Sequence, residues 1–247
     1  MTQPLLYVFT VSHFCEKARW ALDYKGIGYQ LRTVLPGPHR LTVPKLAPTS
    51  RVPVLVDGAT TLQDSGPIID YIDELHEQRA LTPSDPALRS EAVEWEEYLD
   101  VELGEAVRRY LYRFALSAPG FVGPLYVQDG PWWARPFYTF MLRPVIAAAA
   151  KMYLRPTESG ADDLRRIRAV FTRADQRLAE HRYLVGDEFT RADLTFAALA
   201  APILRPAGHP AKWPPDRVCP PELIAETKDL RDSRAGRHVY ELYRTLR

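Results

Sequence analysis

The spacing of apolar residues divides the chain into two unlike halves. Up to about residue 76, short β-branched and aromatic runs alternate with helical patterns, which predicts a small α/β sheet with helices packed on it. After the polar, proline-bearing segment 81–86, strand signals nearly vanish and apolar residues recur at helical spacing. We therefore expect an α/β domain over residues 1–80, a linker over 81–86, and an all-helical domain over 87–247.

The same pattern predicts individual elements. In the first half we expect a strand at 5–11, a helix at about 15–25, a strand at about 29–34, a loop with a possible short helix at 36–48, strands at 52–57 and 60–62, and a helix at 65–77. In the second half, two apolar stripes recur at steps of three or four: Leu99, Leu103, Val107, Leu111 and Phe114, and then Leu164, Ile167, Phe171, Ala174 and Leu178. Such stripes are typical of amphipathic helices that bury one face in a core.

Two proline-rich stretches, 119–136 and 202–221, interrupt the helical pattern. Because proline lacks a backbone donor and clashes inside a helix, we expect ordered loops or short caps over the bundle there. The longest apolar-rich segment, 137–154, is interrupted by two basic residues and a proline, whereas a membrane span needs about 20 predominantly apolar residues. We interpret it as a core or pocket-lining helix, with attachment to a membrane surface as the alternative.

Composition excludes several classes of function. The chain has 247 residues, of which 46% are hydrophobic, and its 32 basic residues nearly balance 31 acidic ones. A nucleic-acid partner is therefore not expected, because such partners require a concentrated positive field. The first residues lack the basic region of a secretory signal. Cys15 and Cys219 are too few for a disulfide framework and do not have metal-ligand spacing, so we expect no metal and a reducing, cytoplasmic setting.

Candidate chemistry begins where the first strand meets the first helix, at Ser12 and Cys15. A helix N-terminus stabilises a thiolate, because its free amides and dipole favour negative charge. The Ser12 hydroxyl could donate a hydrogen bond to such a thiolate. It could equally be an N-cap whose oxygen accepts from the helix amides. The segment alone leaves both interpretations open.

Two further places carry unusual residues. Pro53 lies inside an apolar strand, where proline belongs at an edge or in a cis bond that would turn the Val52 backbone outward. The sequence does not decide between them. Asp64 and Ser65 are cap residues that open another helix, and the free amides there make an anion site.

Together these places resemble the cytosolic glutathione transferases, of a serine-type, bacterial-like kind. The resemblance spans nearly the whole chain and is carried by Ser12 seven residues before Arg19, the run Val52-Pro53-Val54-Leu55, Asp64-Ser65 followed by Ile68-Ile69, and Phe189-Thr190-Arg191-Ala192-Asp193, which looks like the family's capping box and staple. It implies a thioredoxin-like N-terminal domain, a helical C-terminal domain that contributes an electrophile pocket, and a homodimer that acts in detoxification.

The resemblance also implies glutathione as co-substrate and assigns site residues. In the family, the serine at the position of Ser12 contacts the glutathione sulfur. The residue at Val52 pairs its backbone with the tripeptide beside a cis-proline, here Pro53, and the pair at Asp64 and Ser65 holds the γ-glutamyl end.

Other residues match family positions more loosely. Phe14 and His13 are expected to border the glutathione site. Arg51, His39 and Lys45 lie where family members often contact the glycyl carboxylate or the γ-glutamyl backbone. For the electrophile pocket, the aromatic-rich segments near Tyr110-Leu111-Tyr112 and Trp132 to Tyr138 are the candidates.

The expected function is therefore conjugation of the glutathione thiolate to a small apolar electrophile, with Ser12 as the catalytic residue. One alternative is a non-catalytic binding or scaffold protein, for which the stretches 119–136 and 202–221 could build a surface. Another is a glutathione-dependent reductase that works through Cys15. A glutaredoxin-like pair would need a cysteine at the position of Ser12, so we expect Cys15 to be a buried apolar residue and Cys219 to be structural.

Overall fold

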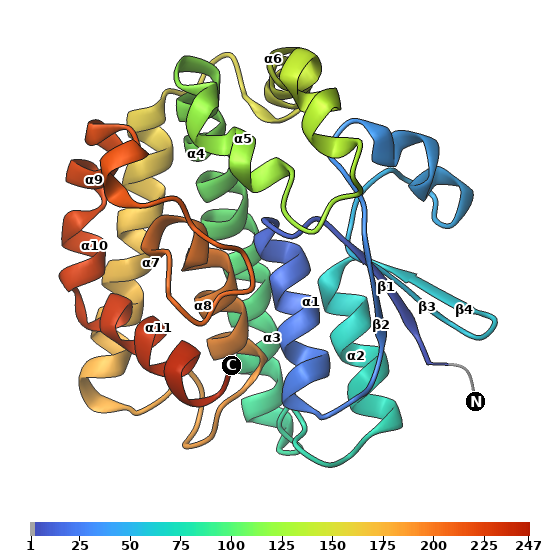
Figure 1. Ribbon diagram of the computed structural model, residues 1–247. Helices are drawn as coiled ribbons and strands as arrows, with labels where there is room; N and C mark the ends of the chain where they lie inside the picture. Colours follow the sequence, from blue (N-terminus) through green and yellow to red (C-terminus); the bar gives the residue numbers. More distant parts are fainter. Residues whose placement is uncertain (1–2) are drawn as a thin grey trace.

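The computed structural model describes residues 3–247, and it places a sheet at one side of the molecule and a helical bundle at the other (Figure 1). The N-terminal unit contains β1 (Leu5–Val8), α1 (His13–Tyr24), β2 (Gln30–Thr33), the short 3₁₀ helices η1 (Pro38–Leu41) and η2 (Val43–Lys45), β3 (Val54–Asp57), β4 (Thr60–Gln63) and α2 (Ser65–Leu75). The strand order is β2-β1-β3-β4, with β1 parallel to β2 and the other pairs antiparallel. The predicted alternation of strands and helices is confirmed.

Strand β1 is shorter than the predicted strand 5–11. Its Leu6 and Val8 side chains are fully buried, as expected for one face of a half-buried strand. After Val8 the chain turns, because the Ser12 amide donates a 3.1 Å hydrogen bond to the Phe9 carbonyl. Residues 9–12 therefore form a tight connection that aims Ser12 at the start of α1.

The second unit is helical. It contains α3 (Pro86–Leu99), the π-helical turn η3 (Asp100–Gly104), α4 (Glu105–Ser117), α5 (Pro119–Tyr126), α6 (Ala134–Tyr153), α7 (Gly160–Glu180), α8 (Arg191–Leu204), the 3₁₀ turn η4 (Asp216–Val218), α9 (Pro221–Glu226), α10 (Lys228–Asp232) and α11 (Arg234–Thr245). Within residues 3–247, no helix is long and apolar enough to cross a bilayer.

The stretch 119–136 is more helical than predicted. Pro119 takes the first position of α5, where its missing N–H is not needed by the helix, and α6 already begins at Ala134. By contrast, most of 202–221 is a loop between α8 and α9, as predicted. The predicted helix at 137–154 is confirmed as α6.

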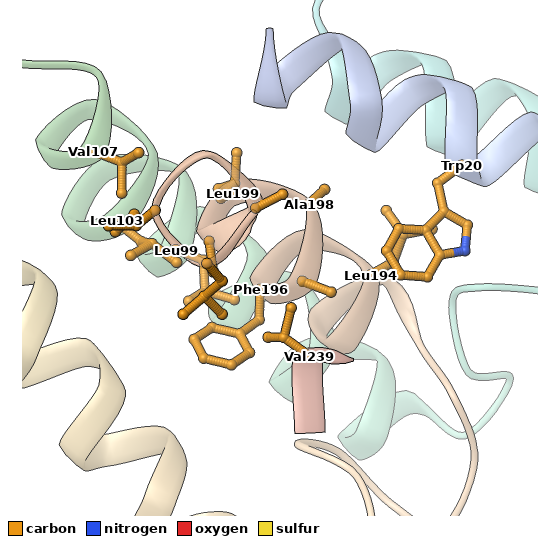
Figure 2. Close-up of a cluster of buried hydrophobic side chains, with 14 of the residues drawn as sticks. Trp20, Leu99, Leu103, Val107, Leu194, Phe196, Ala198, Leu199 and Val239 are labelled. Atoms are coloured by element: carbon orange, nitrogen blue, oxygen red, sulfur yellow. The ribbon is translucent and has the colours of Figure 1, made fainter. Parts of the chain in front are cut away.

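Helix α8 is the centre of the core. Every residue from Arg191 to Leu204 is buried, which is typical of a helix surrounded by others. Figure 2 shows side chains of α8 lying among those of its neighbours: Leu194, Phe196, Ala198 and Leu199 with Trp20 of α1, Leu99 of α3, Leu103 of η3, Val107 of α4 and Val239 of α11. The first predicted stripe therefore lies in the core at Leu99, Leu103 and Val107, whereas Leu111 and Phe114 are only partly buried. All five residues of the second predicted stripe, 164–178, are buried.

The start of α8 is fixed by the predicted capping box. The Thr190 hydroxyl accepts from the helix, and the buried Asp193 carboxylate accepts in return from the Thr190 amide at 3.3 Å. Asp193 also accepts from the Leu184 amide at 2.8 Å, so it ties the preceding loop to the helix. The capping box is confirmed.

A buried ion network joins the two units. The Lys17 ammonium of α1 lies 2.7 Å from a carboxylate oxygen of Glu96 on α3, and Glu96 also pairs with Arg191 on α8. Arg191 in turn reaches Asp70 of α2 at 2.6 Å. Helices of both units therefore meet at this network.

Candidate active site

A cavity of about 980 Å³ lies between the sheet unit and the bundle. The turn before α1, the β2–β3 loop and the start of α2 line one side, and η3, α4, α5 and α6 line the other. Among the sequence candidates, the residues on its wall are Ser12, His13, Phe14, His39, Arg51, Val52, Asp64 and Ser65. Pro53 is buried behind the wall, and Lys45 is exposed outside it.

Ser12 is the N-cap of α1, and its oxygen accepts a 3.4 Å hydrogen bond from the Cys15 amide. A hydroxyl that accepts through a lone pair keeps its own proton for donation. Since Ser12 also lines the cavity, the two interpretations of its hydroxyl are compatible. The residue can cap the helix and still donate to an anion in the cavity.

Val52 and Pro53 are joined by a cis peptide bond, which the sequence alone did not decide. The Pro53 carbonyl accepts from the Asp64 amide at 3.1 Å, so the two turns that face the cavity are tied together. The Gln63 side-chain amide donates to the carbonyls of Thr49 and Arg51 at 2.9 and 2.8 Å. These bonds hold the loop that carries Arg51 against the end of β4.

The start of α2 lines the cavity with Ser65, Gly66 and Pro67, and the first amides of a helix have no partner within the helix. Asp64 has a φ of 83°, its carboxylate makes no capping hydrogen bond, and Ser65 is almost fully buried. Free amides at a helix N-terminus bind anions. This corner of the cavity therefore has donors for a carboxylate.

Asp100 adds a second carboxylate to the cavity wall and was not found from the sequence. It lies in η3 and accepts from the Lys17 ammonium at 2.9 and 2.8 Å. Burial raises the pKa of Asp100, and the positive charge of Lys17 opposes that shift. No motif in the sequence marks this residue, because it reaches the cavity only through the interdomain contact.

The π-helical turn also positions the residues beside Ser12. His13 and the Gly104 carbonyl form a 2.9 Å hydrogen bond through Nε2. Burial, followed by the positive charge of Arg108, lowers the pKa of His13 to about 3, so the ring is neutral at pH 7 and Nε2–H is the donor. Phe14 packs so closely on Gly104 that a Cβ there would lie 2.7 Å from its Cζ.

Replacing Gly104 with alanine is expected to lower the free energy of unfolding by about 1–3 kcal/mol, because the added methyl group overpacks a filled contact. The same methyl group would approach Leu199 Cδ1 to 3.1 Å, so the Phe14 ring cannot yield freely. Urea unfolding measures the change. Gly120→Ala is the matched control, since a Cβ there meets nothing within 4 Å; an equal loss in both variants would contradict the expected packing.

The bundle supplies an apolar wall opposite Ser12. It is formed mainly by Leu111, Tyr112, Phe121, Leu125, Val145 and Tyr153. The segment Trp132 to Tyr138 was predicted to line the electrophile pocket, and this prediction is wrong because none of its residues lies on the cavity wall. Trp132 is 87% exposed, and the Tyr138 hydroxyl donates to the Pro36 carbonyl at 2.6 Å. Tyr110 lies in the core, so only Leu111 and Tyr112 of the predicted aromatic segments reach the cavity.

Both cysteines are buried. Cys15 has no exposed surface. Burial raises its pKa to about 12, although hydrogen bonds with the Ser12 side chain and the Phe9 backbone oppose that shift. Cys219 lines the cavity, where its sulfur lies 2.9 Å from the Arg205 guanidinium, and burial raises its pKa as well. Within the part of the chain that the structure describes, no group of three or more His, Cys, Asp or Glu could hold a metal ion.

Comparison with known families assigns both units. The family model for the glutathione S-transferase N-terminal domain matches residues 6–80, and the one for the C-terminal domain matches residues 142–214. A probable glutathione S-transferase of Nicotiana plumbaginifolia is 33% identical over 107 residues, which are 42% of this chain and 49% of the relative. A probable maleylacetoacetate isomerase of Caenorhabditis elegans is 30% identical over 92 residues, 36% of this chain and 43% of the relative.

The matches thus span about half the length of the curated relatives. Solved structures match over nearly the whole chain. The beta-etherase LigF of Sphingobium sp. has a TM-score of 0.65 at 21% identity and covers 98% of this chain and 99% of its own. A glutathione S-transferase of Methylobacterium radiotolerans in complex with glutathione sulfonate has a TM-score of 0.57 at 21% identity, with 97% and 95% covered.

At that identity the solved structures establish the fold alone, a thioredoxin-like N-terminal domain followed by a helical domain. The two family models show that the sequence itself is related to the family, because each model matches one of the two domains and the matches follow the expected order. The chain belongs to the glutathione S-transferase family.

Proposed function

We propose that this protein conjugates glutathione to a small, largely apolar electrophile, with Ser12 stabilising the thiolate. The observation that carries the proposal is a single cavity that combines three features. The Ser12 hydroxyl, the free N-terminus of α2 and the apolar wall of the bundle all face it. Membership of the family supports the same activity.

The charges of the cavity fit those of glutathione, which has two carboxylates and one ammonium group. The amides at the start of α2 suit the γ-glutamyl carboxylate, and the Asp64 and Asp100 carboxylates suit its ammonium. Arg40 and Arg51 line the cavity from the β2–β3 loop and suit the glycyl carboxylate. In this arrangement the Val52 backbone would pair with the central cysteine of the tripeptide, beside the cis-proline.

The chemistry then requires few protein groups. The glutathione thiol releases its proton to solvent, and the Ser12 O–H donates a hydrogen bond to the resulting thiolate. The sulfur forms a bond to the electrophilic carbon while the leaving group departs with its electron pair. His13 does not act as a base here, because its pKa is low and its Nε2–H is committed to the Gly104 carbonyl. The apolar wall holds the electrophile against the sulfur.

Calorimetric titration with glutathione tests the proposal directly. We expect saturable binding to the parent protein and about tenfold weaker binding to Asp64→Asn, since hydrogen bonds to charged groups are worth about 1.5–3 kcal/mol. Glu74→Gln is the matched control, because Glu74 is an exposed carboxylate on the same helix and does not line the cavity. Absence of any binding at millimolar glutathione would reject the transferase and favour the scaffold alternative.

The reductase alternative makes a separate prediction that mass spectrometry can test. A reductase would form a mixed disulfide on Cys15 after treatment with oxidised glutathione. Because Cys15 is fully buried and its pKa is raised to about 12, the thiolate is scarce at pH 7 and we expect no adduct there.

A further inference from the structure

Arg108 is a cation of the cavity wall that the proposed binding of glutathione does not use. It lies on α4, and its Nε is buried without a hydrogen-bond partner among residues 3–247. Glu105, one turn earlier, pairs instead with Arg109 at 3.2 Å and Arg155 at 3.4 Å. A guanidinium is always charged at neutral pH, and no described residue accepts a hydrogen bond from the two terminal nitrogens of Arg108, so these donors remain available to a ligand.

Aromatic rings hold the Arg108 guanidinium in place. Its central carbon lies 4.2 Å from the centre of the Tyr153 ring and 5.5 Å from that of Phe14. Such contacts orient a guanidinium but accept none of its hydrogen bonds in the plane of the group. Phe14 follows Ser12 by two residues, and Tyr153 belongs to the apolar wall. Arg108 therefore stands where the sulfur-binding end of the cavity meets the wall proposed to hold the electrophile.

The other charges that line the cavity are already matched. Asp64, Asp100, Arg40 and Arg51 face the charges of glutathione in the proposed arrangement, and Asp100 also accepts from Lys17. Arg205 lines the cavity too, but it is paired with Asp216 at 2.6 Å.

Arg108 thus forms no ion pair with a described residue, and the nearby Glu105 carboxylate, which also lines the cavity, is shared by Arg109 and Arg155. A largely buried cation without an ion-pair partner of its own is costly, and an anionic ligand lowers that cost.

We propose that Arg108 selects electrophiles that carry a carboxylate or another oxyanion on an apolar body, and that it binds this anion during conjugation. The inference deepens the proposed transferase function and rests on it. Arg108 would bind the anion bidentately, while the aliphatic and aromatic side chains around Tyr153 hold the remainder of the substrate. The electrophile is thereby oriented by one fixed charge at the boundary between the two substrates.

A matched pair of electrophiles tests the proposal. 4-Chloro-3,5-dinitrobenzoate and 4-chloro-3,5-dinitrobenzamide share the ring and the chloride leaving group, and they differ in one negative charge. Arg108→Gln is expected to lower kcat/KM roughly tenfold or more for the benzoate and less than about twofold for the benzamide. The ratio of variant to parent for each compound cancels their different intrinsic reactivities.

Two further variants and one further measurement complete the design. Arg108→Lys should restore part of the preference for the benzoate, whereas Arg135→Gln should leave it unchanged, because Arg135 is exposed on α6 outside the cavity. The KM for glutathione should stay the same in Arg108→Gln. A raised KM for glutathione with equal losses for both electrophiles would place the glycyl carboxylate on Arg108 and overturn the inference, as would no change with either compound.

Binding without turnover separates failure of this inference from failure of the proposed function. Calorimetry with 3,5-dinitrobenzoate and 3,5-dinitrobenzamide, in the presence and absence of glutathione, does not depend on conjugation. We expect tighter binding of the benzoate to the parent protein and loss of that preference in Arg108→Gln. If the parent conjugates neither electrophile, the transferase proposal fails, and equal binding of the two compounds would then reject the anion site as well.

Discussion

Ser12→Ala is expected to reduce kcat/KM for glutathione conjugation about tenfold or more at pH 7. The substitution removes a hydrogen bond to a charged sulfur, an interaction worth about 1.5–3 kcal/mol, and each 1.36 kcal/mol is a factor of ten in rate. The measurement is the initial rate with a chromogenic chloronitrobenzene, together with the pH dependence of that rate. Activity equal to that of the parent would reject the assignment of Ser12.

Two control variants separate catalysis from helix capping. Ser12 caps α1 by accepting from the Cys15 amide, so alanine should also cost about 1 kcal/mol of stability. Ser12→Gly should lose the same activity but only a few tenths of a kcal/mol, because glycine is a tolerated N-cap. Cys15→Ala should keep most of the activity, since Cys15 has no exposed surface.

The expected pH profile of the rate follows from the direction in which Ser12 shifts the pKa of the bound glutathione thiol. Ser12 is proposed to lower the pKa of the bound thiol, so the ratio of thiolate in the parent to thiolate in Ser12→Ala is greatest below that lowered pKa and falls as the pH rises toward the unperturbed value near 8.5. Above about pH 8.5 the thiolate forms without help, and the rates of parent and Ser12→Ala should converge.

The size of this effect also limits what Ser12 can supply. Lowering the thiol pKa by about two units raises the thiolate fraction at pH 7 from about 3% to roughly 75%. A less basic thiolate is a weaker nucleophile, with a slope near 0.4–0.5 for disulfide exchange, so about eightfold of that gain is lost again. The net gain from the lowered pKa is therefore only several-fold, so part of the loss expected in Ser12→Ala comes from poorer orientation of the sulfur. Orientation of the sulfur and of the electrophile supplies most of the acceleration.

Local patterns predicted the elements that local chemistry decides. The capping box of Thr190 and Asp193 follows from residue types at fixed spacing, so it was accessible from the sequence. The start of α2 at Ser65 was also predicted, but the Asp64 carboxylate does not make the expected capping hydrogen bond. The break between α3 and α4, by contrast, could not be predicted from the sequence. The apolar stripe from Leu99 to Phe114 continues across η3, because a single π-helical turn hardly disturbs a helical spacing.

Tertiary packing decided the parts of the cavity that the sequence did not reveal. Asp100 and Arg108 reach the wall because the π-helical turn and α4 lie against the start of α1, and neither residue belongs to a motif. The opposite error occurred at Trp132, where an aromatic pair suggested a pocket although the fold leaves that side chain exposed. Aromatic residues in a sequence indicate a large area for contacts, but they do not indicate whether those side chains line a cavity or remain exposed.

Glu96→Ala is expected to lower the free energy of unfolding by about 3–5 kcal/mol, because removing one member of a buried ion network leaves its partners uncompensated. Glu96 is 3% exposed and pairs with both Lys17 and Arg191, which have 0% and 5% of their side chains exposed. Lys17 keeps its pair with Asp100 and Arg191 keeps its pair with Asp70, but both of these carboxylates are more exposed than Glu96 and are therefore better screened by solvent. Denaturant unfolding measures the loss.

The same substitution should loosen the contact between the two domains, because Lys17 lies on α1 while Glu96 and Arg191 lie on α3 and α8. Glu97→Ala controls for the loss of a carboxylate, since its neighbour Glu97 is exposed on the same helix and its removal should change stability by less than about 0.5 kcal/mol. Glu96→Gln keeps the shape and loses the charge, so it should fall between the two. If Glu96→Ala and Glu97→Ala unfolded at the same denaturant concentration, Glu96 would contribute nothing to holding the domains together, and the position of α1 against η3 would have to rest on apolar packing, the Lys17–Asp100 pair and the His13–Gly104 hydrogen bond.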